Sequence, residues 1–162
     1  MANEQQTVPL THFTDGLSAI LKECFETVTS PSMFLDPGDA FFQTLATVSA
    51  EEASRPAANG ISNIAAEVNH TAFYINVTLQ FLRGEHPGKV DWDGSWQVGV
   101  VDEAQWARLQ DTLQMAYDAL QVAVTQPASW AHPQAITGGI GMVAHCAYHL
   151  GEVRRTLGVI RG

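Results

Sequence analysis

The sequence predicts an all-α protein, and three observations lead to this fold class. Four long segments carry apolar residues at the three- and four-residue spacing of an amphipathic helix. Proline and other loop-forming residues fall in the breaks between these segments. No segment shows a sustained alternation of apolar and polar residues, the pattern of a strand. We therefore expect residues 1–162 to form a single domain, a four-helix bundle with one short accessory helix between the first and second long helices.

The first half of the chain is expected to hold the first long helix and the accessory helix. The long helix covers about residues 9–29, where apolar residues recur at i, i+4, i+7, i+8 and i+12. The accessory helix begins at Asp36 and Pro37, because an N-cap residue there precedes a proline at the first helical position. It ends near residues 54–56, at Ser-Arg-Pro.

The second long helix, about residues 62–84, carries two apolar stripes on nearly opposite sides. A helix that is apolar on two faces is usually central in its fold, so we expect it to lie inside the bundle. Residues 85–101 follow as a loop rich in glycine. The third long helix begins at Asp102, with Gln105 completing a capping box, and reaches Pro127. The last helix covers about residues 135–160.

Composition excludes several classes of function. The chain has 17 acidic and 8 basic residues, a formal charge of −9, so it lacks the Lys and Arg that neutralise nucleic-acid phosphates or anionic lipids. No apolar run is long enough to cross a bilayer, and residues 1–6 lack the start of a secretory signal. Cys24 and Cys146 form no CxxC motif. We expect a cytoplasmic protein with free thiols, a small-molecule substrate, and neither a nucleic acid nor a membrane as partner.

Three histidines are the candidate metal ligands. His145 and His149 are four residues apart, so both imidazoles lie on one helix face and can bind one ion; the alternative is a coincidence of spacing. His70 lies midway along the second long helix, where the alternative is a core histidine with a hydrogen-bond partner. Together the three form a metal site with an open fourth position. Such a site makes a bound water acidic or a thiol into a thiolate.

Residues 142–155 (MVAHCAYHLGEVRR) resemble the C-terminal helix of the DinB-like superfamily of four-helix-bundle proteins, which are damage-inducible or YfiT-related. Four more segments match in order: residues 49–56 (SAEEASRP), 67–70 (EVNH), 82–85 (LRGE) and 91–96 (DWDGSW). The resemblance implies a divalent metal held by one histidine of the second helix and an HxxxH pair of the last. In this sequence these are His70, His145 and His149. It also implies a homodimer.

Relatives in this superfamily include S-transferases that use low-molecular-weight thiols, a maleylpyruvate isomerase and metal-dependent hydrolases. The leading hypothesis is therefore a metal-dependent enzyme that transfers a low-molecular-weight thiol to a small electrophile. One alternative is a hydrolase that uses metal-activated water, and another is a stress or binding protein that the metal only stabilises. Three imidazoles suit zinc, nickel, copper or iron, of which zinc and nickel are favoured. No catalytic residue beyond the ligands is assigned.

Four neighbours are candidate pocket residues or supports for the ligands. Trp92 and Trp96 either line a substrate pocket near the metal or hold their loop against the helices. Glu152, one turn beyond His149, either orients an imidazole N–H or is a solvated acid. Met142 lies on the same helix face as the histidine pair. Cys146 points about 100° away from His145 and is interpreted as a packed thiol.

Overall fold

The computed structural model describes residues 7–28, 30–57, 60 and 62–162, so residues 1–6 and Thr29, the predicted end of the first helix, lie outside the described residues. The prediction of an all-α fold is confirmed, because the described residues form six α-helices and two 3-10 helices and contain no strand. The elements are α1 (Leu10–Phe25), α2 (Phe41–Leu45), α3 (Ala50–Ser54), α4 (Ile64–Leu82), η1 (Gly94–Trp96), α5 (Glu103–Val124), η2 (Pro127–Trp130) and α6 (Pro133–Arg161).

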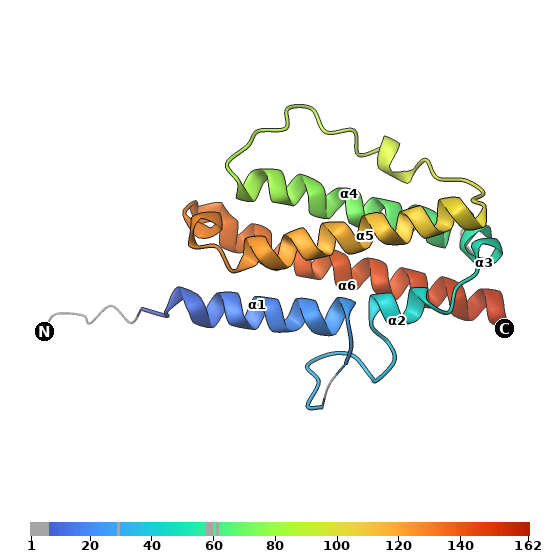
Figure 1. The fold of residues 1–162 in the computed structure, drawn as a ribbon, viewed down its shortest axis with the longest axis horizontal. Coiled ribbons are helices and arrows are strands. Elements are labelled where there is room, and N and C mark those ends of the chain that lie inside the picture. Colours follow the sequence, from blue (N-terminus) through green and yellow to red (C-terminus); the bar gives the residue numbers. More distant parts are fainter. Residues whose placement is uncertain (1–6, 29, 58–59, 61) are drawn as a thin grey trace, which may run out of the picture.

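The four long helices α1, α4, α5 and α6 lie side by side, and their directions determine where the loops run (Figure 1). In Figure 1, α1 and α6 run in one direction, while α4 and α5 both run in the other. Because α4 and α5 are parallel, the chain after α4 must return along the whole length of that helix before α5 begins. The connection between Leu82 and Glu103 does this and passes over α4 (Figure 1).

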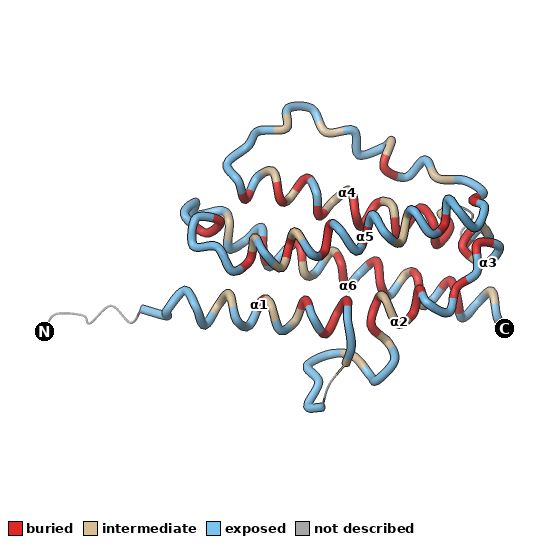
Figure 2. Tube along the Cα trace, viewed as in Figure 1, coloured by how far each residue is buried: buried red, intermediate tan, exposed pale blue. Residues whose placement is uncertain are grey.

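Helix α4 is the central helix, as its two apolar stripes predict. Twelve of its 19 residues are buried, and it packs against α5, α6, α3 and η1. One stripe, which includes Ile64, Val68 and Ile75, lies in the hydrophobic core. The other stripe faces the returning connection, which is exposed over most of its length and buried at Ser95 in η1 (Figure 2). The second stripe therefore lies under a loop, and it carries His70.

The accessory region contains two short helices, so the prediction of one helix from Asp36 to residues 54–56 is wrong. Asp36 and Pro37 lie in a turn, and α2 begins only at Phe41. Ser49 has extended backbone and accepts a hydrogen bond from the Glu52 N–H, while the Glu52 carboxylate accepts from the Ser49 N–H. This capping box starts α3 and divides the segment, because an N-cap residue cannot lie inside a continuous helix.

Helix α1 ends at Phe25, four residues before the predicted end, and Glu23 explains the position of the chain that follows. The Glu23 carboxylate accepts hydrogen bonds from the backbone N–H groups of Met33, Phe34 and Leu35. Burial raises the pKa of Glu23, but these three hydrogen bonds favour the carboxylate and leave that pKa below its usual value. The loop after α1 is thus fixed to the helix by one side chain.

No helix in the described part of the chain combines the length and the apolar character needed to cross a lipid bilayer.

Candidate metal centre

The structure brings together the three histidines that the sequence singled out. His70 comes from the middle of α4, and His145 and His149 come from successive turns of α6. One ring nitrogen of each lies within 4.8 Å of the others. His70 and His149 are buried, and His145 is half-buried. Side chains that are 75 and 79 residues apart in sequence thus share one site, because α4 packs against α6.

His149 is held by a carboxylate. Its Nδ1 lies 2.7 Å from Glu67 Oε2, and Glu67 is itself buried one turn before His70 on α4. The other oxygen of Glu67 accepts a hydrogen bond from the Ser62 hydroxyl at 2.8 Å. The carboxylate accepts a hydrogen bond from Nδ1–H, and in a neutral imidazole with its proton on Nδ1 the lone pair is on Nε2. Histidines that bind metals commonly donate their second N–H to such a partner.

His70 is oriented by Ser95 of η1. The Ser95 hydroxyl donates its single hydrogen to the Trp92 carbonyl at 2.6 Å, and the same oxygen lies 2.7 Å from His70 Nδ1. Because that hydrogen is already used, Ser95 Oγ must accept from the Nδ1–H of His70. The lone pair of His70 is therefore on Nε2, as in His149. The sequence interpretation of His70 as a core histidine explains the hydrogen bond of its Nδ1 but not why its ring lies 5.1 and 4.9 Å from those of His145 and His149, between centroids.

His145 has a buried ring nitrogen with no partner. Its Nε2 is inaccessible to solvent and makes no hydrogen bond with the described residues. The ring of Tyr74 stacks on the ring of His145, with 3.6 Å between centroids and 15° between planes. A buried polar nitrogen without a partner costs free energy, and a metal ion at the centre of the three rings satisfies it. The residues present therefore fit a divalent transition metal.

The distances and the protonation states agree with this fit. Ligand nitrogens on a tetrahedral metal are about 3.4 Å apart for bonds of about 2.1 Å, so each ring needs to move by less than about 1 Å. Burial, reinforced by the neighbouring His149, lowers the pKa of His70 to about 4. Burial, His149 and His70 together lower the pKa of His145 to about 3. Both rings are neutral near pH 7, the form that binds metals.

The two tryptophans of the returning connection, Trp92 and Trp96, contact different aromatic rings near the three histidines. Trp96 stacks on His70, with 3.9 Å between ring centroids and 17° between planes. Trp92 lies against the aromatic side chains of Phe73 and Tyr74, at 5.5 and 5.8 Å between centroids. Trp96 thus covers the ring of His70 directly. Trp92 holds the loop on α4 and also borders a cavity beside the end of that helix.

The other residues considered from sequence have different partners or surroundings. The Glu152 carboxylate bonds to Arg155 at 2.6 Å, and the partner of His149 is Glu67 instead. Met142 is fully buried in the hydrophobic core. Cys146 is also fully buried there, as expected for a packed thiol.

Sequence reasoning did not assign the residues that hold the ligands. Glu67 lies three residues before His70, a spacing that puts both on one face of a helix, so the pair gave a signal that was not used. Ser95 and Tyr74 gave none, because their roles depend on how the connection and α6 pack on α4.

Comparison of the chain with protein-family models, with curated proteins and with solved structures gives no match in any of the three.

Proposed function

We propose that this chain is a DinB-like four-helix-bundle protein that binds one divalent transition metal, zinc or nickel, through His70, His145 and His149. We propose further that the centre catalyses transfer of a low-molecular-weight thiol to a small electrophile. The observation that supports this most is the arrangement of the three rings. Two of them have Nδ1 engaged by Ser95 and Glu67, and the third has a buried Nε2 with no partner.

The number of ligands favours a catalytic role over a purely structural one. Structural zinc sites are closed by four protein ligands, whereas catalytic sites have three and keep one position open. The described residues supply three ligand atoms to this group, and Glu67, the nearest carboxylate in the hydrogen-bond network, is already engaged on both oxygens. An open position for a small molecule follows from this set.

Thiol chemistry fits the site better than hydrolysis. Glu67 bonds to Nδ1 of His149, on the side of the ring away from Nε2, so its carboxylate orients this ring and is not placed to take a proton from a water bound between the three rings. A thiol has a pKa near 8.5, against 15.7 for bulk water, so it needs much less help to ionise. A metal bound here supplies Lewis acidity that favours the thiolate. Glu67 and Ser95 orient two ligand rings, while Trp96 and Tyr74 cover the rings and exclude water.

The experiment uses monochlorobimane as electrophile, because it becomes fluorescent when a thiol sulfur replaces its chloride. The C–S bond forms, the C–Cl bond breaks, chloride leaves with the bonding pair and the thiol proton goes to solvent. Zinc-loaded and nickel-loaded proteins are assayed with cysteine, glutathione and 2-mercaptoethanol, beside His145→Ala. We expect metal-dependent conjugation with at least one thiol and none above background in the variant.

Hydrolysis of p-nitrophenyl acetate is measured on the same samples. Hydrolysis without conjugation would replace the transferase proposal with a hydrolase. Stoichiometric metal without either activity would favour a binding protein that the metal stabilises.

A further inference from the structure

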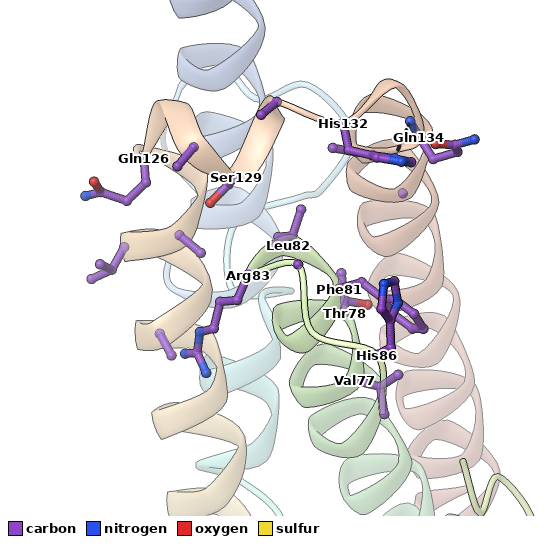
Figure 3. A pocket seen from close by; sticks show the side chains of 18 of the residues that line it. Val77, Thr78, Phe81, Leu82, Arg83, His86, Gln126, Ser129, His132 and Gln134 are labelled. Carbon is purple, nitrogen blue, oxygen red and sulfur yellow. Dashed lines mark hydrogen bonds between the residues drawn. The ribbon is translucent and has the colours of Figure 1, made fainter. Parts of the chain in front are cut away.

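A large cavity lies at the end of the molecule where α4 finishes and α6 begins. Its volume is about 1050 Å³, and it runs between the end of α4, the second half of α5, η2 and the first turns of α6. In Figure 3, Phe81, Thr78 and His86 lie on the α6 side of α4, while Arg83 extends towards α5. The volume is at the upper end of the range for sites that bind drug-sized molecules.

The cavity adjoins the metal centre through shared aromatic residues. Tyr74 borders the cavity and stacks on His145, and Trp92 borders it and lies 6.4 Å from His70 between ring centroids. The α4 residues along the cavity, from Tyr74 to Phe81, continue the helix face that carries His70 one turn earlier. At 1.5 Å per residue, Phe81 is about 16 Å from His70 along the axis. A molecule of that length spans the distance from centre to rim.

The charges around the cavity differ from those of the chain as a whole. The chain has 17 acidic and 8 basic residues, yet no Asp or Glu is among the described residues that border the cavity. Arg83 borders it and forms no ion pair with the described residues. His86 and His132 add exposed imidazoles at the rim. The remaining lining is largely alanine, valine, leucine and aromatic side chains.

We propose that this cavity holds the electrophilic substrate of the metal centre, an elongated apolar molecule with a single anionic group. The apolar body lies along the α6 side of α4 with its reactive end at Tyr74, and the anionic group reaches round the end of α4 to Arg83 on the α5 side. The identity of the occupant as a substrate rests on the proposed function; the binding site itself does not. An apolar anion fits because the cavity offers a largely apolar lining and presents a cation without a competing carboxylate.

Two fluorescent probes test the site: 8-anilinonaphthalene-1-sulfonate, an apolar anion, and N-phenyl-1-naphthylamine, which has the same rings and no charge. Gly138→Leu is the main variant, because Gly138 borders the cavity on helical α6 and a Cβ added there meets nothing within 4 Å. The leucine side chain is expected to take up part of the cavity beside α6. Gly158→Leu is the matched control, a glycine of α6 with equally open surroundings that does not border the cavity.

We expect one equivalent of either probe to bind the wild type and Gly158→Leu, and Gly138→Leu to bind each at least about tenfold more weakly. Arg83→Gln should weaken the sulfonate about two- to fivefold, the scale of an exposed ion pair, and leave the neutral probe unchanged. Arg108→Gln, an exposed arginine away from the cavity, is its control. Unchanged binding in Gly138→Leu would overturn the site, and equal effects of Arg83→Gln on both probes would overturn the anionic preference. Should Gly138→Leu fail to fold, Thr78→Trp fills the cavity from α4.

Metal content on the same samples separates this proposal from the proposed function. One equivalent of zinc without probe binding overturns the cavity site and leaves the metal centre intact. If the wild type binds the probe but retains no zinc after zinc has been added, the metal centre is overturned and the cavity site stands. Where conjugation is observed, the sulfonate probe should inhibit competitively against monochlorobimane; non-competitive inhibition would mean that the substrate binds elsewhere.

Discussion

Removal of the Glu67 carboxylate is expected to weaken metal binding without removing a ligand. Glu67 Oε2 lies 2.7 Å from His149 Nδ1, and both side chains are buried, so no water replaces this bond easily. Loss of such an orienting partner typically costs 10- to 100-fold in metal affinity. That range equals about 1.4–2.7 kcal/mol. For Glu67→Ala we expect a value near the upper end, because the His149 N–H then has no acceptor.

Glu67→Gln keeps an oxygen that accepts from the His149 N–H, and its new NH2 group can donate to the Ser62 hydroxyl, but the negative charge is lost. Its zinc affinity should therefore lie between those of the wild type and Glu67→Ala. The assay is competition for Zn²⁺ with a chromophoric chelator, with circular dichroism to confirm folding. Glu152→Gln is the control, because that carboxylate bonds to Arg155 instead of a histidine. Equal zinc affinities for Glu67→Ala and Glu152→Gln would refute the assignment of Glu67 as the partner that orients His149.

Three further predictions concern other parts of the structure. Ser95→Ala removes the acceptor of the His70 N–H, a neutral hydrogen bond worth about 1 kcal/mol, so zinc affinity should fall about fivefold; no change would mean that His70 needs no orientation. Glu23→Ala should lower the free energy of unfolding by about 1–3 kcal/mol at pH 7 by urea denaturation. Because the folded-state pKa of Glu23 is lowered, the difference in free energy of unfolding between the wild type and Glu23→Ala is present above the unfolded-state pKa and should be lost as pH falls through the folded-state pKa. A difference that does not change with pH would contradict the role of these hydrogen bonds. Burial raises the pKa of Cys24 to about 12 and raises that of Cys146, so neither thiol should react with Ellman's reagent at pH 8 until urea unfolds the chain.

The long helices could be predicted from sequence because their signals are local. The third long helix was expected to begin at Asp102 with a capping box to Gln105, and both hydrogen bonds of that box are present. The two stripes of α4 indicated a central helix, and most of its residues are buried. The accessory region was misjudged because the N-cap at Asp36 outweighed the capping box at Ser49, which is equally local and was visible in the sequence.

The three-histidine cluster was also accessible from sequence, whereas the residues that orient its rings were not. The spacing of His145 and His149 places them on one helix face. His70 stood out because it lies midway along the second long helix, and the resemblance implies the same three residues. Glu152 was a candidate acceptor because it lies one turn beyond His149 on the same helix. Glu67 reaches His149 only because α4 packs against α6, and Ser95 reaches His70 only because two parallel helices require a long returning connection. Both contacts depend on tertiary structure, and local spacing does not encode them.

The central claim is that three imidazoles bind one metal ion. The most direct test is the metal content of protein purified without a histidine tag, before and after incubation with zinc or nickel, for the wild type and His145→Ala. We predict about one equivalent per chain in the wild type and less than about one tenth in the variant, with the helical content of both unchanged. Retention of one equivalent by His145→Ala, or no metal in the wild type after incubation, would contradict the assignment of this cluster as a metal centre.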